Sequence, residues 1–214
     1  MGRRKTPLRS GCFYHVYSRS IAGFEIFRFK PEFVRMRAAL QFYQHSRAHA
    51  SLGEFLRNPA VRRRETAGSP LIRIIAFCLM PTHIHLFLEQ MADEGISEYM
   101  RRVMGSYAAF FNTRAERKGP LWESRFKARL VETDEYAWHL SRYIHLNPVT
   151  AGLVKRPDEW GFSSYREYLG IKGMETLCDF NKVIPATPDI YRKFSEDQMD
   201  YQRSLRYLQP LCFD

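Results

Sequence analysis

Residues 71–90 read LIRIIAFCLMPTHIHLFLEQ, and the strands predicted here form the centre of the expected fold. It contains two apolar runs, 72–79 and 84–88, whose β-branched and aromatic residues predict two β-strands. Pro81 has no backbone N–H to donate to a neighbouring strand, so it belongs in the connection between them. The stretch therefore predicts a β-hairpin that turns at residues 80–82.

The second predicted strand carries two histidines in a His-x-His pattern. Because side chains alternate along a strand, His83 and His85 project from one face, with Cα atoms about 7 Å apart. Two imidazoles at this spacing can converge on one cation. An isolated pair of this kind is also typical of a polar sheet surface, so the choice between the two interpretations depends on the rest of the chain.

The composition excludes several classes of protein. A chain of 214 residues with 45% hydrophobic and 14% aromatic residues can bury one substantial core, which excludes a disordered protein. Its 33 Lys and Arg against 23 Asp and Glu favour a polyanionic partner, either nucleic acid or an anionic membrane. The four cysteines form no Cys-x-x-Cys pair, which argues against a zinc finger or disulfide scaffold. No apolar run is long enough to span a membrane, so we expect a cytoplasmic protein.

The remaining pattern predicts strands and helices in a definite order. The stretch 48–70 is mostly polar and is expected to be a long basic loop. A helix in the region 135–146 should end before Asn147, because a residue that precedes proline avoids the α region. The other expected elements are a strand at 13–18, a helix from Pro31 to about residue 45, a strand at 121–132 and a helix from about Pro188 with apolar residues as far as Leu205. A helix of about twenty residues from Ile96 is also expected, because an apolar stripe that includes Tyr107 recurs at three- and four-residue steps. This order predicts an α+β, ferredoxin-like antiparallel sheet with helices on one side and the 135–146 helix against the other. His15 of the first strand is expected to be a sheet residue, although it could line the same face as the histidine pair.

Two groups of basic residues are candidates for binding DNA. The predicted 121–132 strand has one fully basic face, where cations recur about every 7 Å, a spacing suited to a phosphate backbone. The predicted basic loop and an N-terminal arm (Arg3, Arg4, Lys5 and Arg9) add further positive charge. For the loop, a solvated charge run is the default interpretation, and contact with phosphates is the functional alternative. The candidate DNA-binding residues are Arg62, Arg63, Arg64, Arg125, Lys127 and Arg129.

The 135–146 helix supplies the other candidate functional residues. Tyr143 and Asn147 are four positions apart and so share a helix face. If that face meets the sheet, two imidazoles and one amide oxygen could hold Mg²⁺ or Mn²⁺ as a Lewis acid for a phosphate. A tyrosine beside such a phosphate is a potential nucleophile. Alternatively, Asn147 terminates the helix and Tyr143 packs in the core.

Four motifs, in this order along the chain, resemble those of the HUH-type single-tyrosine DNA transposases, most closely the REP-associated tyrosine transposases. They are Pro81-Thr82-His83-Ile84-His85, the run GPLWESRF at 119–126, the run YIHLNPV at 143–149 and the run WGFSSY at 160–165. The resemblance covers about residues 10–170. It implies a catalytic domain at 1–170, with 171–214 as a C-terminal helical appendage whose role the sequence does not disclose.

The resemblance implies a metal-dependent transposase that cleaves and rejoins single-stranded hairpin DNA. Carried over by position, His83, His85 and Asn147 would bind Mg²⁺ or Mn²⁺. Tyr143 would attack a DNA phosphate and leave a 5′-phosphotyrosine and a free 3′-hydroxyl. The resemblance leaves open the target sequence, whether the protein still mobilises DNA, and whether it forms a homodimer.

Two other functions remain open on the residues alone. A sheet with exposed aromatic side chains and arginine rows could bind single-stranded nucleic acid by stacking, without catalysis. A metal-dependent phosphodiesterase that uses water as the nucleophile would make Tyr143 dispensable. The combination of His-x-His with Tyr-x-x-x-Asn favours the transposase over a stacking platform, which needs neither motif.

Overall fold

The computed structural model describes residues 8–45, 50–65, 68–171, 173 and 176–199. Its centre is a four-stranded antiparallel sheet with the strand order β2-β3-β1-β4. The strands are β1 (Phe13–Arg19), β2 (Ile72–Met80), β3 (His83–Gln90) and β4 (Lys127–Val131). The predicted hairpin is confirmed, since β2 pairs with β3 and only Pro81 and Thr82 lie between them.

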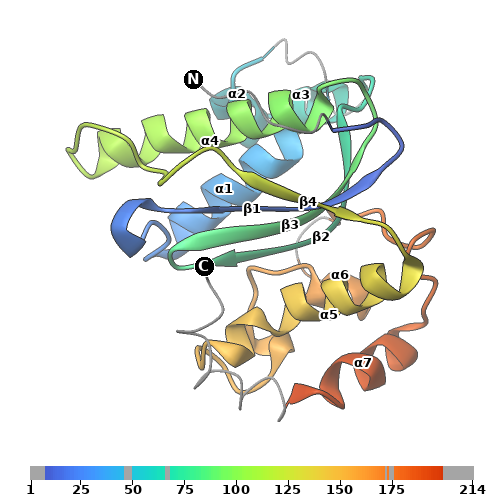
Figure 1. Cartoon of the computed structure of the whole chain (residues 1–214). Helices are drawn as coiled ribbons and strands as arrows, with labels where there is room; N and C mark the ends of the chain where they lie inside the picture. Colours follow the sequence, from blue (N-terminus) through green and yellow to red (C-terminus); the bar gives the residue numbers. More distant parts are fainter. Residues whose placement is uncertain (1–7, 46–49, 66–67, 172, 174–175, 200–214) are drawn as a thin grey trace.

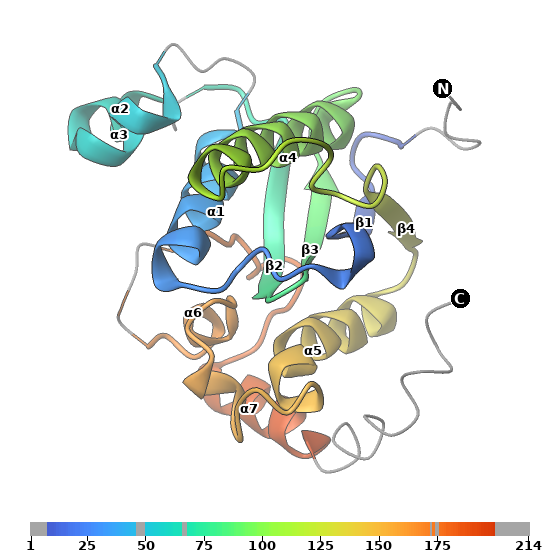
Figure 2. The ribbon, with the colours of Figure 1, turned by 90° about the vertical axis from the view of Figure 1, so that its left-hand side faces the viewer.

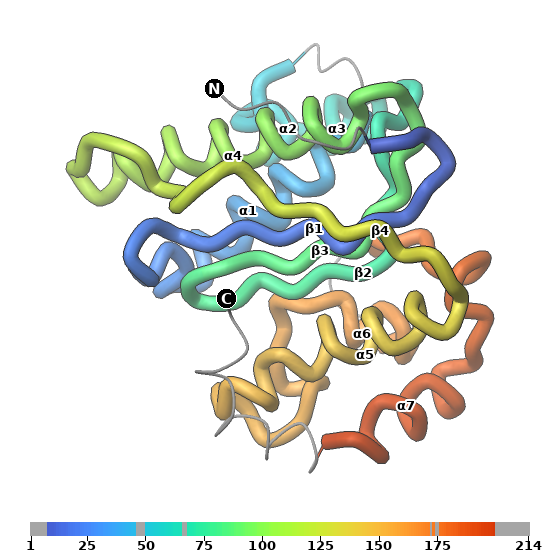
Figure 3. The backbone as a smooth tube through the Cα atoms, in the orientation of Figure 1, coloured from blue at the N-terminus to red at the C-terminus, as the bar shows by residue number. Residues whose placement is uncertain are grey.

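Helices cover both faces of the sheet (Figure 1). On one face lie α1 (Lys30–Phe42) and α4 (Gly95–Arg114), and on the other lie α5 (Asp134–Thr150), α6 (Tyr165–Tyr168) and α7 (Pro188–Glu196). The tube in Figure 3 shows the chain passing from β1 through α1, the β2–β3 hairpin and α4 to β4 before it reaches α5. The predicted ferredoxin-like α+β fold is therefore confirmed, and α5 lies against the sheet face that α1 and α4 leave open.

Each face of the sheet has its own hydrophobic core. Val16 and Leu86 belong to the core beneath α1 and α4, together with Tyr107 of the predicted apolar helix stripe. Phe87 lies on the opposite face, in the core that includes Ile144 of α5. Because side chains alternate along a strand, the neighbours of Val16 in β1 and of Leu86 in β3 face the opposite way. The histidines of both strands are on this second face, toward the α5 layer.

Residues 48–70 do not form the predicted loop but contain two helices, α2 (Leu52–Arg57) and α3 (Pro59–Glu65). The Ser51 hydroxyl accepts from the Glu54 amide, and the Glu54 carboxylate accepts from the Ser51 amide at 2.8 Å. This capping box starts α2, and burial of Phe55 beside α1 holds it. The prediction was wrong because helices this short offer too few apolar positions for a visible stripe.

The helix α5 also departs from the prediction, because it continues through Asn147 and Pro148 to Thr150. The Ala151 amide donates to the Asn147 carbonyl at 2.9 Å, and Val149 is buried on the added turn. Proline in a helix interior leaves one carbonyl without its helical partner. Here the burial of the last turn outweighs that cost, so Asn147 does not terminate the helix.

The predicted strand at 121–132 begins only at Lys127. Ser20 bridges Trp122, and Tyr17 pairs with Lys127, so residues 123–126 lie opposite only Ser18 and Arg19 of β1. The longer segment must bulge away from the ladder. A hydrogen bond from Trp122 Nε1 to the Met104 carbonyl, at 3.0 Å, anchors its start to α4.

The segment after Gly170 runs past the β2 edge of the sheet and contributes to both cores: Leu177 and Cys178 belong to the core beneath α1 and α4, and Ile184 belongs to the core on the α5 side. The Asp179 amide donates to the Ile74 carbonyl of β2 at 2.9 Å. The predicted helix at Pro188 is present as α7, with the Thr187 hydroxyl capping its first turn and Tyr191 completely buried. The basic arm at residues 3–5 and the predicted continuation of this helix toward Leu205 lie outside the described residues.

In the parts of the chain that the structure describes, no helix is both long and apolar enough to cross a lipid bilayer.

Candidate active site

His83 and His85 lie next to each other at the start of β3, on the sheet face that α5 covers. Their ring centroids are 5.0 Å apart and their planes cross at 89°. His85 is 4% exposed, so it does not belong to a solvated polar surface. The placement of both rings on one face agrees with the strand alternation expected from the sequence.

Both imidazoles are anchored through Nδ1. His83 Nδ1 lies 2.9 Å from Thr82 Oγ1, and His85 Nδ1 lies 3.0 Å from His15 Nε2. His85 Nε2 is buried and has no hydrogen-bond partner within the described residues. Histidines that bind metals typically hold a fixed partner through the nitrogen that does not face the ion. The donor atoms present at this site therefore fit a divalent cation.

Burial keeps these histidines neutral. It lowers the pKa of His15 to about 4, with a further contribution from the charge of Arg129. It lowers the pKa of His83 to about 4, with Arg19 acting in the same direction. The pKa of His85 also falls well below its usual value, first because of burial. A neutral imidazole has a free lone pair on one ring nitrogen, so each ring can bind a cation without first losing a proton.

The helix α5 brings Tyr143 and Asn147 to the histidine pair. The Tyr143 ring meets that of His85 edge-on, with centroids 5.5 Å apart. The Asn147 side chain interacts with both neighbours: it offsets part of the fall that burial causes in the pKa of His83 and part of the rise that burial causes in the pKa of Tyr143. Asn147 Nδ2 is buried without a hydrogen-bond partner in the described part of the chain. Because Asn147 does not cap the helix, its amide is available to the site.

A cavity of about 180 Å³ opens beside the histidine pair, between β3 and the segment that leads into β4. Arg125 and Lys127 line it together with Arg19 of β1. Arg129 lies opposite His15 in the β1–β4 register. The basic row predicted from the sequence therefore lies along one edge of the site, although Arg125 precedes the strand and only Lys127 and Arg129 belong to it.

The structure does not bring Arg62, Arg63 and Arg64 to this site. They belong to α3, which lies beyond α1 on the opposite side of the sheet from α5 (Figure 2). Arg62 lies over the Phe55 ring, with Cζ 5.5 Å from the centroid, and Arg64 pairs with Glu65 at 2.9 Å. Any contact that these arginines make with DNA is therefore separate from the histidine pair.

The sequence carries no signal for Arg19, and it favours His15 as a sheet residue that could share the face of the histidine pair. In the β1–β3 register Arg19 lies opposite His83, and His15 lies opposite Phe87, which is two positions from His85 on the same strand face. The alternation of β1 placed His15 on one of two faces, but only the register shows that it is the face of His85. Within the described residues, no group of three or more His, Cys, Asp or Glu side chains could hold a metal, so the candidate set depends on the Asn147 amide.

Comparisons with known proteins agree with this geometry. The family model described as Transposase IS200 like matches residues 43–147, which include His83, His85, Tyr143 and Asn147. A putative REP-associated tyrosine transposase of Haemophilus influenzae is 28% identical over 102 residues, covering 42% of this chain and 57% of that protein. The REP-associated tyrosine transposase of Escherichia coli is 29% identical over 94 residues, covering 43% and 53%. The match thus spans about half the length of these curated relatives.

A solved structure shows the same fold. It is a REP-associated tyrosine transposase bound to a REP hairpin, and it matches with a TM-score of 0.55 at 18% identity. The match covers 84% of this chain and 95% of the other. The family model and the two relatives confirm the resemblance that the four sequence motifs predict, and the solved structure confirms the fold.

Proposed function

We propose that this relative of the REP-associated tyrosine transposases is a metal-dependent enzyme that cleaves and rejoins single-stranded hairpin DNA through a covalent tyrosine intermediate. One observation carries the proposal: the side chains of His83, His85, Tyr143 and Asn147 meet at one site between the sheet and α5. A stacking platform for nucleic acid requires no such meeting. The hairpin in the solved neighbour supports the choice of substrate.

The metal would be held by His83, His85 and Asn147. Mg²⁺ or Mn²⁺ bound there would supply Lewis acidity to a DNA phosphate. The neutral imidazoles and the neutral amide add no negative charge, so they do not repel an anionic substrate. The cations of Arg125 and Lys127 at the cavity edge would hold the neighbouring phosphates of the strand.

Tyr143 would act as the nucleophile. Burial raises the pKa of its hydroxyl, so the side chain carries its proton before the reaction. As the bond from Tyr143 Oη to phosphorus forms, the bond from phosphorus to the 3′ oxygen breaks. The proton lost by the tyrosine is balanced by the proton gained by that 3′ oxygen, which leaves a 5′-phosphotyrosine and a 3′-hydroxyl. Attack by a 3′-hydroxyl on the phosphotyrosine reverses these steps and rejoins the strand.

The test is incubation with labelled single-stranded hairpin DNA and Mg²⁺, followed by a denaturing gel. We expect a protein–DNA adduct that Tyr143→Phe abolishes, because phenylalanine keeps the ring and removes only the hydroxyl. Tyr136→Phe is the matched control, since it lies about two turns earlier on α5 and should leave the adduct intact.

The other outcomes identify the alternative functions. Binding without any cleavage would make the protein a non-catalytic single-stranded nucleic-acid-binding protein. Cleavage that persists in both Tyr143→Phe and Tyr136→Phe would make water the nucleophile, and the transposase mechanism would be wrong.

A further inference from the structure

His145 lies on α5 between Tyr143 and Asn147 but on the other side of the helix. Side chains two positions apart on a helix differ in direction by about 200°. Accordingly, His145 is completely buried among tyrosines from the segments that follow α5, with ring centroids 4.7 Å from Tyr168 and 5.6 Å from Tyr191. The face of α5 that carries His145 is therefore the face turned away from the histidine pair.

Both ring nitrogens of His145 have a close polar partner. Nδ1 lies 2.7 Å from Tyr191 Oη of α7, and Nε2 lies 2.7 Å from Ser164 Oγ. The Ser164 hydroxyl in turn accepts from the Phe77 amide of β2 at 2.9 Å. A single side chain of α5 is thereby connected to the sheet on one side and to α7 on the other.

The chain of hydrogen bonds continues from α7 back to α5. Tyr191 Oη lies 3.0 Å from Ser141 Oγ, and Ser141 Oγ lies 2.8 Å from the Trp138 carbonyl. Because that carbonyl can only accept, Ser141 donates to it and accepts from Tyr191. Tyr191 has then used its one proton, so it accepts from His145 Nδ1–H.

This order also fixes the other end of the chain. With the proton on Nδ1, His145 Nε2 accepts from the Ser164 hydroxyl, whose oxygen accepts the Phe77 N–H. Each donor in this chain of hydrogen bonds, from the Phe77 amide to the Trp138 carbonyl, then has one acceptor. A neutral imidazole with its proton on Nδ1 satisfies all of these contacts at once.

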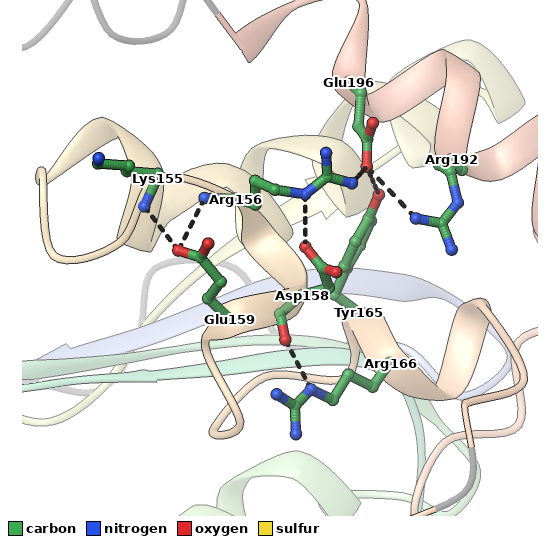
Figure 4. A network of polar contacts seen from close by, with 8 residues as sticks. All are labelled: Lys155, Arg156, Asp158, Glu159, Tyr165, Arg166, Arg192 and Glu196. Atoms are coloured by element: carbon green, nitrogen blue, oxygen red, sulfur yellow. Dashed lines mark hydrogen bonds and ion pairs between the residues drawn. The ribbon is translucent and has the colours of Figure 1, made fainter.

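The remaining polar contacts of α7 are more exposed. Figure 4 shows Glu196 at the end of α7 beside Arg156, Arg192 and Tyr165, and the Arg156 side chain in this network is 46% exposed. Ion pairs that are open to solvent contribute little to stability. The Arg142 guanidinium also reaches the Phe194 carbonyl, but at 3.3 Å. Within the described residues, the buried bond between Tyr191 and His145, at 2.7 Å, is shorter than the other polar links between α7 and α5.

We propose that His145 is a positioning residue for the reaction, and that α7 holds it in place through the Tyr191 hydroxyl. The proposal rests on the proposed function, because Tyr143 must be the group that is positioned. A helix tied on one side to β2 and α7 cannot turn about its axis, so Tyr143 and Asn147 stay directed at His83 and His85. A displacement of about 1 Å at a reacting group can cost about 100-fold in rate.

The test compares Tyr191→Phe with Tyr168→Phe. Tyr168 belongs to the same buried cluster, and its hydroxyl donates to the Ile75 carbonyl at 2.9 Å. Tyr168→Phe therefore also removes a buried tyrosine hydroxyl with its hydrogen bond, whereas Tyr191→Phe removes the two bonds that join His145 and Ser141. Only Tyr191→Phe breaks the chain to His145. We expect the single-turnover rate of adduct formation to fall about tenfold or more in Tyr191→Phe and to stay within about twofold of wild type in Tyr168→Phe. The Kd for the hairpin should be unchanged in both variants.

Hydrogen exchange gives a readout that does not depend on the chemistry. Amides of residues 141–147 should exchange faster in Tyr191→Phe than in wild type or Tyr168→Phe. Equal adduct rates in the two variants, or equal exchange, would overturn the positioning role. If the wild type forms no adduct, the proposed function fails, and the exchange comparison still decides whether the chain anchors α5. His145→Phe should slow adduct formation at least as much as Tyr191→Phe.

Discussion

His85 Nδ1 lies 3.0 Å from His15 Nε2, so a residue of β1 orients a histidine of β3. The two rings are stacked, with an interplanar angle of 19° and centroids 5.3 Å apart. If His85 binds a cation through Nε2, its proton must be on Nδ1 and His15 must accept it. His15 would then select the tautomer of His85 without contacting the ion itself.

We expect His15→Phe to raise the Mg²⁺ concentration needed for half-maximal adduct formation by about 10- to 100-fold, because the acceptor that holds the His85 ring is lost. Hairpin affinity measured without metal should not change. Tyr17→Phe is the control, since the Tyr17 ring also stacks near His85, with centroids 6.1 Å apart. A His15→Phe midpoint equal to that of wild type would contradict the role given to His15.

Asn147→Ala should also raise the Mg²⁺ midpoint, because it removes the amide oxygen from the site. Mn²⁺ should restore part of the activity, since it binds the remaining imidazoles more strongly. Asn147→Asp should hold metal at least as well as wild type, while its added charge offsets part of the attraction for phosphate. Thermal melts of the same variants distinguish an effect on metal binding from an effect on stability. An unchanged midpoint with a lowered melting temperature would make Asn147 a structural residue.

Lys127→Ala and Arg63→Ala should have different effects on DNA binding and cleavage. Lys127 lines the cavity beside the histidines, so its loss should weaken hairpin binding and slow cleavage of bound DNA. Arg63 lies on α3, so its loss should change affinity alone. Each phosphate contact removed should reduce the slope of log K against log salt by about 0.7 for a single strand. Binding that is insensitive to salt, or that favours plain duplex, would exclude this mode of recognition.

Two glycines of α4 provide a matched test of the fold. A Cβ built at Gly95 would lie 2.2 Å from the Leu71 carbonyl oxygen, whereas one at Gly105 would meet nothing within 4 Å. Gly95→Ala should therefore destabilise the protein, because the rigid backbone of Leu71 cannot move aside. Gly105→Ala should stabilise it by about 0.5–1 kcal/mol, since alanine favours the helix. Chemical denaturation of both variants measures the two free energies of unfolding.

Local patterns predicted the elements that have a clear signal of their own. Two runs of β-branched and aromatic residues around Pro81 predicted the hairpin, and apolar residues at three- and four-residue steps predicted α4, and both agree with the structure. The helices α2 and α3 have no such repeat and depend on the Ser51 cap and the burial of Phe55. The last turn of α5 forms because Val149 is buried. The prediction that the helix ends before Pro148 considered only the local backbone and not this burial.

The residues of the candidate site also fall into two groups, those that short motifs predict and those that only the tertiary structure reveals. His83, His85, Tyr143 and Asn147 carry short motifs that the sequence displays directly. His15 and Arg19 reach the site only through the pairing of β1 with β3. Tyr191 meets His145 across a gap in sequence that no local pattern spans. Groups brought together by tertiary contacts of this kind carry no signature that can be read from either segment alone.

The helix α7 follows every proposed catalytic residue along the chain, so the ribosome makes it after them. This order affects when the protein becomes active during synthesis. The pairing of Phe13 with Val131 and the contact of His145 with Tyr191 both join distant parts of the chain. Such non-local contacts form late, because loop closure must precede them. A growing polypeptide that has reached Asn147 already contains every proposed ligand and the nucleophile, but it lacks the hydroxyl that anchors α5. The full rate of DNA cleavage would then be reached only after α7 has been made and has docked.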